Sequence, residues 1–355
     1  RGTTHAFAQP YTVLERRGVR IGVIGILGQD AATALVPSHI AGLDVLEPAA
    51  VVRRYVELLR PNVDLVVVLT HQGYTAPMQT DDEADPTVQR GNAENIALAG
   101  AVPGIDVILA GHTDAGTRTP LVHPETGTLI MQTFGQGQHL GFLQLHLPDS
   151  QPGAGAAKPR LLDGRLIAVD SDALAPQAVV AGKLERYRRA YPEIYAPVGR
   201  TAGPMVRRYY LESDLGNLFA DILRQHTAAD VALMPSGALR KDLPAGVIRK
   251  VDLLDAFPFE DRVARVTLSG DVLLQIIEQG LSLERGLLQV SGLMVTYDPR
   301  APVGARVVSA AVNGRAIEHD HSYQVATLEI LAQGGDAYVQ FHRAADIEFE
   351  ETGFA

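Results

Sequence analysis

The fold is decided by the stretch Leu65-Val66-Val67-Val68-Leu69-Thr70-His71-Gln72-Gly73, in which an apolar run leads into a histidine and a glycine. The arrangement recurs in Asp106-Val107-Ile108-Leu109-Ala110-Gly111-His112-Thr113-Asp114. Short apolar runs that end at polar and glycine residues predict buried strands. Because open α/β sheets bind ligands at the carboxyl ends of their strands, we expect both histidines at a ligand-binding edge.

Apolar runs and helical patterns alternate around these two segments, which indicates a layered α/β domain. The predicted strands are Arg20–Leu27, the two runs above, Leu129–Thr133 and Leu140–Leu147, and the predicted helices are Ala49–Leu59 and Asn92–Ala101. The low-complexity stretch Gln151–Pro159 predicts a surface loop, and Gln177–Tyr191 predicts a solvated helix that connects two domains. Beyond Gly199 we expect a second α/β unit. Its predicted elements are the helices Ser213–Gln225 and Val272–Gly280 and the strands Val231–Met234, Gly292–Tyr297 and Tyr323–Ala326.

The composition narrows the class of function. A chain of 355 residues, with 46% hydrophobic and 20% charged residues, is typical of a globular protein with two domains. No apolar run reaches about 18 residues, so no transmembrane segment is predicted. The formal net charge of −10 argues against a nucleic-acid surface but permits a small phosphorylated ligand. The absence of cysteine leaves imidazole and carboxylate groups as metal ligands, and nothing in the composition sets the oligomeric state.

The ends of the chain also carry an expectation. The sequence starts at Arg1 without a methionine or a signal peptide and stops at Ala355 without a closing element. We therefore expect a piece of a longer chain whose signal peptide lies upstream.

The two histidine segments differ in how strongly they predict a metal site. His71 alone is more typical of a hydrogen-bonded loop residue than of a ligand. The turn Gly111-His112-Thr113-Asp114 is a stronger signal, because an imidazole and a carboxylate on a tight turn can face the same point. Together the segments predict a site for Zn, Mn or Fe, with few ligands for a dinuclear centre.

A series of motifs along nearly the whole chain resembles the 5′-nucleotidase family of metallophosphoesterases. The motifs are Pro10-Tyr11-Thr12-Val13-Leu14-Glu15, Gly18–Gly25, Leu69–Gly73, Val102–His112, Glu212-Ser213-Asp214-Leu215-Gly216-Asn217, Phe257-Pro258-Phe259, Gln289-Val290-Ser291-Gly292, Val325-Ala326-Thr327 and Gly334-Gly335-Asp336-Ala337-Tyr338. The resemblance implies a mixed α/β and α+β chain with three parts. These are the C-terminal portion of a metallophosphoesterase β-sandwich flanked by helices (residues 1–172), a linker helix (173–198) and a second α/β nucleotide-binding domain (199–355).

The resemblance also implies a hydrolase of phosphoester or pyrophosphate bonds in nucleotides: a 5′-nucleotidase, a UDP-sugar hydrolase or a 2′,3′-cyclic-nucleotide phosphodiesterase. Members of the family are periplasmic or extracellular enzymes that use two divalent ions, which would be Mn, Zn, Fe or Mg. His71 and His112 match ligands of one ion. Asp114 matches a ligand of the other ion at a position where histidine is commonest, which should favour harder metals.

The remaining ligands and the catalytic His–Asp pair belong, in the family, to Asp-x-His, Gly-Asp and Gly-Asn-His-Glu motifs upstream of the Pro10-Tyr11 segment. None of the three precedes that segment here. The resemblance therefore predicts that this chain alone is close to inert, because no bridging carboxylate would hold two metal ions about 4 Å apart. No residue of the chain is assigned as catalytic.

The nucleotide is expected to bind the second domain. A guanidinium on the small-residue loop before Arg240 can bind a phosphate in bidentate fashion, although an ion pair with Asp242 or Glu260 is the plain alternative. Pro235 stands where the family has Asn. The other residues that match substrate contacts are Arg207 or Arg208 for phosphate, Phe259 and Ile330 around the base, Asp261 in place of an Asn near the base edge, and Asp336. Phe259 could equally be a core residue, and Asp336 the polar residue of a turn.

Two alternatives to a nucleotide hydrolase remain open from the sequence. Ile330 in place of a second aromatic ring, together with Pro235, suits a thiosulfohydrolase-like enzyme of the same superfamily. The absent motifs suit a nucleotide-binding protein without turnover.

Overall fold

The structure is a computed structural model that describes residues 8–74, 86–135, 137–148, 158–170 and 172–353. The predicted loop at Gln151–Pro159 lies outside these residues except for its last two. The chain divides into two units, the first with residues 1–32 and 42–175 and the second with residues 33–41 and 176–355. Among the described residues, no helix is long and apolar enough to cross a membrane.

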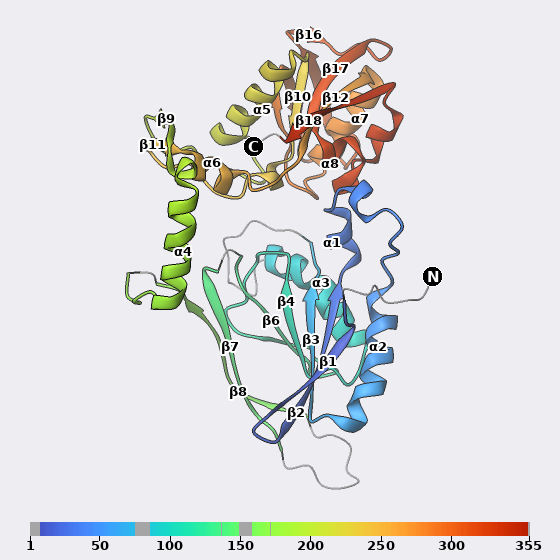
Figure 1. Cartoon of the computed structure of the whole chain (residues 1–355). Coiled ribbons are helices and arrows are strands. Elements are labelled where there is room, and N and C mark those ends of the chain that lie inside the picture. The colour runs from blue at the N-terminus through green and yellow to red at the C-terminus, as the bar shows by residue number, and fades with distance from the viewer. Residues whose placement is uncertain (1–7, 75–85, 136, 149–157, 171, 354–355) are drawn as a thin grey trace. The chain divides into compact units, whose positions relative to one another are not determined.

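Unit 1 is built on a six-stranded sheet whose middle strands are parallel (Figure 1). The strand order is β1 (Tyr11–Arg16), β2 (Val19–Leu27), β3 (Leu65–His71), β4 (Val107–Gly111), β6 (Leu129–Gln132) and β5 (Leu121–Val122). The edge strands β1 and β5 pair antiparallel with their neighbours. The predicted α/β layering is thus present, and every strand predicted for this half of the chain is confirmed.

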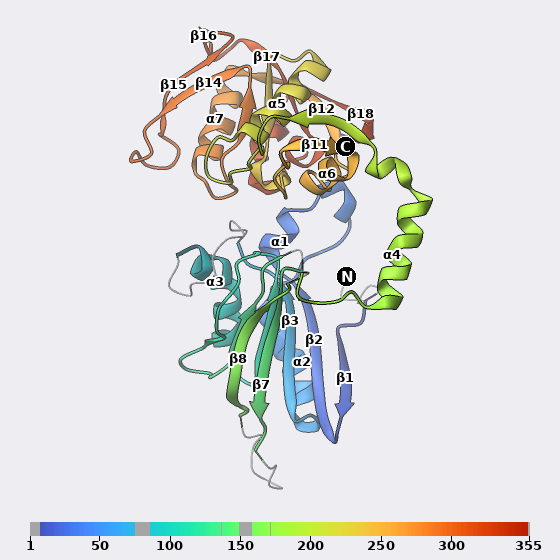
Figure 2. The same cartoon turned by 90° about the vertical axis from the view of Figure 1, so that its left-hand side faces the viewer.

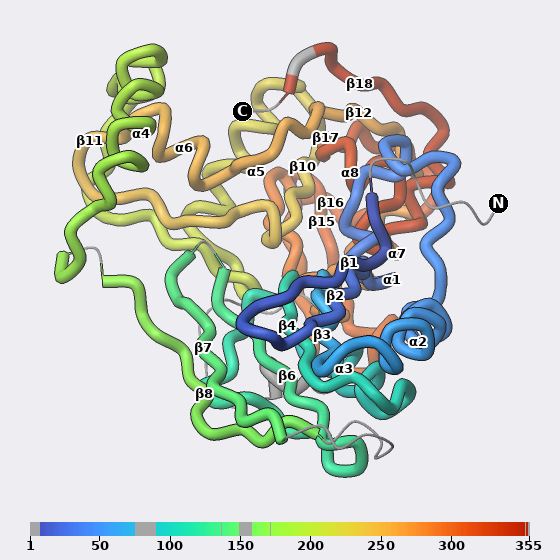
Figure 3. The backbone as a smooth tube through the Cα atoms, turned by 60° about the horizontal axis from the view of Figure 1, so that its bottom comes forward, coloured from blue at the N-terminus to red at the C-terminus, as the bar shows by residue number. Residues whose placement is uncertain are grey.

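Two helices cover one face of this sheet, α2 (Pro48–Leu59) and α3 (Pro86–Ala101). Their buried side chains, which include Val52 and Leu98, pack with Val66 and Val68 of β3. The alternate residues Leu65 and Val67 face the opposite side, where they meet the hairpin of β7 (His139–His146) and β8 (Arg160–Ala168). Figure 3 shows this arrangement, with the helices and the hairpin on opposite sides of the sheet.

Local sequence explains where these helices begin. Pro48 occupies the first turn of α2, and the carboxylate of Glu47 accepts hydrogen bonds from the Ala49 and Ala50 amides at 2.8 and 2.7 Å. The predicted start of the next helix at Asn92 is wrong, because α3 begins at Pro86 and Asn92 is buried inside it. Asn is a favoured cap residue, but here the residue that starts the helix is a proline.

Unit 2 contains a five-stranded mixed sheet with α5 (Asp214–Thr227) and α7 (Gly270–Leu281) on its two faces (Figures 1 and 2). The strand order is β13 (Gln289–Ser291), β10 (Val231–Met234), β17 (Ser322–Leu328), β12 (Arg262–Ser269) and β18 (Asp346–Gly353). Alternation along β10 sends Val231 and Leu233 toward α7 and Met234 toward α5. The strands β12 and β18 were not among the sequence predictions.

Smaller elements complete unit 2. They are α4 (Ala178–Ala190), α6 (Lys250–Ala256), α8 (Glu329–Ala332), the pair β9 (Pro197–Thr201) and β11 (Gly246–Arg249), and the sheet of β14 (Leu293–Tyr297), β15 (Val307–Val312) and β16 (Arg315–Ala316). Short helical turns of unit 2 lie at Pro37–Ile40, Pro192–Tyr195, Ser236–Ala238, Gly335–Ala337 and Val339–Arg343. Unit 1 has one such turn at Arg60–Asn62, and α1 (Gln29–Thr33) lies in unit 1 except for its last residue. The helix α4 has no buried residue and lies in the range predicted for the linker helix.

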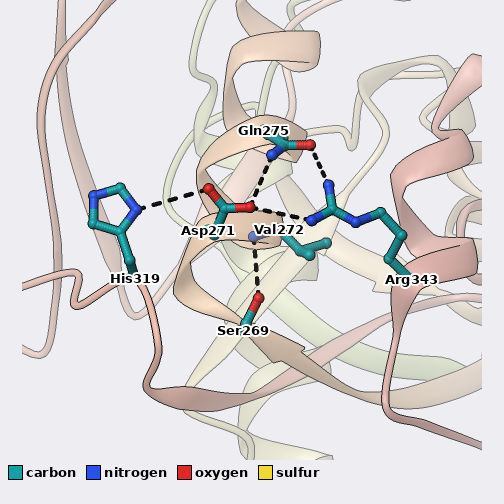
Figure 4. Close-up of polar contacts among 6 residues, drawn as sticks. All are labelled: Ser269, Asp271, Val272, Gln275, His319 and Arg343. Carbon is teal, nitrogen blue, oxygen red and sulfur yellow. Dashed lines mark hydrogen bonds and ion pairs between the residues drawn. The ribbon is translucent and has the colours of Figure 1, made fainter.

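A polar cluster joins three of these elements at the start of α7 (Figure 4). Ser269 caps the helix, and Asp271 accepts hydrogen bonds from Gln275 Nε2 and Arg343 Nη2 at 2.9 and 3.2 Å. His319 Nδ1 lies 3.7 Å from the other carboxylate oxygen of Asp271. These contacts attach the Val339–Arg343 turn and the loop before β17 to α7.

Candidate functional site

The two predicted histidines lie next to each other at the carboxyl edge of the unit 1 sheet. His71 is the last residue of β3 and pairs in register with Gly111, the last residue of β4, so that His112 follows directly. His71 Nε2 and His112 Nδ1 are 3.2 Å apart, and the ring centroids are 4.8 Å apart. Since both strands are parallel, their ends meet at one edge and bring the imidazoles together.

The backbone after β4 is unusual for the residues it contains. His112 has φ of 90° and Asp114 has φ of 56°, both in the left-handed region. A non-glycine residue there costs on the order of 1–3 kcal/mol and persists only where its surroundings hold it. Gly73, with φ of 118°, provides part of that support, because its missing side chain lets the Gly91 carbonyl oxygen and Thr113 Cγ2 approach closely.

A buried network of polar side chains fixes the residues on both sides of His71. The sequence did not predict this network. Asn95 Oδ1 accepts hydrogen bonds from Thr70 Oγ1 and Gln72 Nε2 at 2.8 and 3.0 Å, and all three residues are buried. Glu94 accepts the Gly73 amide at 2.8 Å. These side chains fix both neighbours of His71, but in the sequence they look like ordinary polar residues of a helix.

The histidine pair has the spacing of two ligands on one metal ion. Two imidazole nitrogens on a tetrahedral zinc ion lie about 3.3 Å apart, because each Zn–N bond is about 2.0 Å. The observed separation of 3.2 Å agrees with this value. Within the part of the chain that the structure describes, no group of three or more His, Asp or Glu residues gathers as a metal site, so Asp114 does not complete one with the histidines.

In unit 2, Arg240 and Phe259 lie against each other. The Arg240 guanidinium carbon is 5.2 Å from the centroid of the Phe259 ring. Phe259 is 37% exposed, and its ring meets the buried Phe257 edge-on at 5.7 Å. Phe259 is therefore partly exposed, with its ring between the buried Phe257 and the Arg240 guanidinium.

Strand pairing brings Asp261 to Ile330. Val263 of β12 pairs with Leu328 of β17, so continuing this antiparallel register beyond the strands sets Asp261 opposite Ile330. The Ile330 amide donates to the Asp261 carboxylate. The next pair in this register is Arg262 and Glu329, in which Arg262 Nε donates to Glu329 Oε2 at 2.8 Å.

The Asp261 carboxyl has an unusual pKa. Burial raises the pKa to about 6, and the charges of Glu329 and Asp336 add to this effect, whereas the Ile330 amide and His39 oppose it. The Oδ1 atom is buried without a hydrogen bond in the described structure. A carboxyl of this kind is typical of functional sites, because the energy of its charged form can be changed by a ligand.

Asp336 lies in the same neighbourhood. It has φ of 51° in the turn Gly335–Ala337 and acts on the buried Tyr209 and Tyr338. Burial, and then the Asp336 charge, raise the pKa of both phenols. Asp336 thus lies in a turn, and its charge and that of Arg240 both act on Tyr209.

The remaining predicted phosphate contacts lie on the segment before Tyr209. The Arg207 amide donates to Asp242 Oδ1 at 2.8 Å, and Arg208 is exposed. Asp242 thus accepts a hydrogen bond from the Arg207 backbone amide, and the Arg240 guanidinium lies over the Phe259 ring. The structure brings Arg240, Phe259, Asp261, Ile330 and Asp336 into one region of unit 2.

Comparison with known proteins identifies the second half of the chain. Residues 197–343 match the family model of the 5′-nucleotidase C-terminal domain. This part of the chain has a 5′-nucleotidase C-terminal domain. All of the unit 2 residues discussed above from Arg207 to Asp336 lie inside the matched range, whereas His71 and His112 lie outside it.

Curated relatives match nearly the whole chain at low identity. The chain is 27% identical to the endonuclease YhcR of Bacillus subtilis, over 96% of this chain and 27% of that protein. It is 22% identical to the protein UshA of Yersinia enterocolitica, over 100% of this chain and 68% of that protein. The chain spans about a quarter of the length of YhcR and about two thirds of UshA.

Solved structures show the same fold. The 5′-nucleotidase precursor from Thermus thermophilus has a TM-score of 0.78 and 24% identity, covering 97% of this chain and 69% of that one. The sulfate thiohydrolase SoxB of the same organism has a TM-score of 0.72 and 20% identity, covering 92% of this chain and 58% of that one. At these identities the likeness concerns the fold alone.

Proposed function

We propose that this protein takes part in the metal-dependent hydrolysis of phosphoester or pyrophosphate bonds in nucleotides. The observation that carries the proposal is the convergence of His71 Nε2 and His112 Nδ1 to 3.2 Å at a sheet edge, in a chain that also has a 5′-nucleotidase C-terminal domain. The class of reaction is inferred from the matched 5′-nucleotidase C-terminal domain. The proposed substrates are AMP-like nucleotides, UDP-sugars or cyclic nucleotides.

His71 and His112 would hold one of the two divalent ions, Mn, Zn, Fe or Mg, through the nitrogens that now face each other. Such an ion polarises a phosphoryl oxygen and lowers the pKa of bound water. The role of the chain itself is to hold the two imidazoles in this orientation through the Asn95 network and the His112 backbone. We assign Asp114 to the second ion, in keeping with its place on the same turn.

The unit 2 residues would bind the nucleotide. Arg240, with Arg207 or Arg208, supplies cationic donors for phosphate, and the half-exposed ring of Phe259 offers a face for the base. Ile330 would pack on the base without aromatic stacking, and Asp261 and Asp336 would accept hydrogen bonds from base or ribose. The relatives that support an exported location include a cell wall protein of Listeria monocytogenes, and we propose a periplasmic or extracellular protein accordingly.

The proposal is tested by product formation from AMP, UDP-glucose and 2′,3′-cyclic AMP with Mn²⁺, measured on the longer chain expected from the sequence, together with nucleotide binding by calorimetry. We expect Arg240→Ala and Phe259→Ala to weaken binding about tenfold each, and His112→Ala to abolish any turnover without affecting binding. The matched control is Arg200→Ala, an exposed arginine on β9. Turnover that survives His112→Ala would refute the metal assignment.

Two outcomes would favour the other functions. Nucleotide binding that depends on Arg240, without turnover of any of the three substrates by that longer chain, would indicate a nucleotide-binding protein. Failure to bind nucleotides, with hydrolysis of a sulfur-containing group on a carrier, would indicate the thiosulfohydrolase-like enzyme, which Ile330 favours because it leaves the base without a second ring.

A further inference from the structure

The segment Thr33–Ala41 is part of unit 2, although the residues on both sides of it in the sequence belong to unit 1. It contains the end of α1 and the helical turn Pro37–Ile40. The segment makes two hydrogen bonds to the C-terminal part of unit 2, and each lies next to residues that we assign to nucleoside binding.

The first contact holds Arg285. Its Nη2 donates to Thr33 Oγ1 at 2.8 Å. Arg285 lies between Leu283 and Gly286, both with positive φ, and Gly286 packs against Tyr209. Burial and the Asp336 charge raise the pKa of the Tyr209 and Tyr338 phenols, and the Arg285 charge opposes this. Arg285 therefore faces the same tyrosines as Asp336.

The second contact holds the short helix that carries Ile330. The Ser38 amide donates to Gln333 Oε1 at 3.0 Å, and Gln333 Nε2 donates to Glu329 Oε1 at 2.8 Å. Ile330 lies between these two residues on α8, and the turn with Asp336 follows directly. The Ser38 amide thus holds Gln333 at the end of α8, and Gln333 in turn holds Glu329 at its start.

His39 of the same segment acts on this region through its charge, which lowers the pKa of the Asp261 and Glu329 carboxyls. The other charged groups that act on Asp261 are Glu329 and Asp336.

We propose that Thr33–Ala41 is a positioning element of the nucleoside-binding region: Thr33 orients Arg285, and Ser38 fixes Gln333 with α8. The inference rests on the proposed nucleotide-binding function of unit 2. It adds to that function a set of residues far upstream in the sequence, outside the matched C-terminal domain.

The test measures adenosine and AMP affinity by calorimetry, with hydrogen exchange of the amides in residues 283–286 and 329–337. Gln333→Met removes both hydrogen bonds of that side chain, and Thr33→Val removes the hydroxyl while keeping the shape. We expect affinity for both ligands to fall about threefold to tenfold in each variant, and exchange to rise only in the region that the lost contact braces. Thr33→Ser, which keeps the hydroxyl, should restore wild-type affinity.

The matched control is Gln324→Met, which removes an exposed hydrogen bond to Thr267 elsewhere in unit 2. Unchanged affinity in both Thr33→Val and Gln333→Met, or an equal loss in Gln324→Met, would overturn the inference while leaving the proposed function intact. If the wild-type protein binds neither adenosine nor AMP, the proposed function and the inference fail together.

Discussion

The histidine pair of unit 1 and the Arg240–Phe259–Asp261 region of unit 2 are held in place by different kinds of structure. His71 and His112 end adjacent parallel strands, and buried hydrogen bonds from a neighbouring helix fix the residues around them. The unit 2 residues lie on loops and short turns, where side-chain contacts between distant segments set their positions. The difference indicates that the first site depends on a rigid scaffold and the second on local contacts that a ligand can adjust.

The largest effect should come from disturbing that scaffold at Gly73. A Cβ there would overlap the Gly91 carbonyl oxygen and Thr113 Cγ2 at a positive φ. We expect Gly73→Ala to lower the free energy of unfolding by about 4 kcal/mol, measured by urea denaturation. The control is Gly18→Ala, which also has positive φ but open space around it, and should cost only about 1 kcal/mol. An equal loss of unfolding free energy in Gly73→Ala and Gly18→Ala would mean that close packing at Gly73 does not hold the His112 turn in place.

The next effect tests the metal site itself. Removing one of two imidazole ligands should weaken Mn²⁺ or Zn²⁺ binding by about a hundredfold, or roughly 2.7 kcal/mol. We expect this for both His71→Ala and His112→Ala in calorimetric titrations without nucleotide. His146→Ala, an exposed histidine on β7, is the control and should bind metal as wild type does. Wild-type affinity in either site variant would refute the pairing of the histidines on one ion.

The sequence predicts the histidine pair of unit 1 better than it predicts the Arg240–Phe259–Asp261 region of unit 2. The strands before His71 and His112 are continuous apolar runs, and parallel pairing then brings the histidines together without further information. The meeting of Asp261 and Ile330 depends instead on the register of β12 against β17. The strand β12 escaped prediction because Arg262 and Arg265 interrupt its apolar pattern, although Val263, Ala264 and Val266 are buried. Only a resemblance to known proteins could nominate residues in this region.

Contacts with no sequence signal were missed in both units. Asn95 and Gln72 look like surface residues until the packing of α3 on β3 buries them. The contribution of Thr33–Ala41 to unit 2 is invisible because its neighbours in the chain fold elsewhere. Both depend on tertiary placement, which local patterns do not encode.

Asp261 gives a prediction on pH. Its pKa is raised from 3.8 to about 6, so the folded state binds more protons than the unfolded state between these values. Its contribution to stability is therefore intact below about pH 4 and is lost as the pH rises to about 6. We expect Asp261→Asn to stabilise the protein by about 1–2 kcal/mol at pH 7.5, after allowance for solvent screening, and to have little effect at pH 4. Urea denaturation at both values measures this, and equal effects would contradict the raised pKa.

The smallest effect should come from Asp271, whose carboxylate has more hydrogen-bonding partners than that of Asp261 but lies at the surface (Figure 4). Its side chain is 46% exposed, and exposed ion pairs contribute about 0–1 kcal/mol. Asp271→Asn keeps an acceptor for Gln275 and leaves the hydrogen bond from Arg343 to Gln275 in place, so we expect a loss of about 0.5 kcal/mol. High salt should erase the difference between variant and wild type, because it screens exposed charges, and it should leave the Asp261→Asn effect largely unchanged. A salt-insensitive loss above about 2 kcal/mol would show that partner number, rather than burial, decides how strongly a carboxylate in unit 2 affects folding.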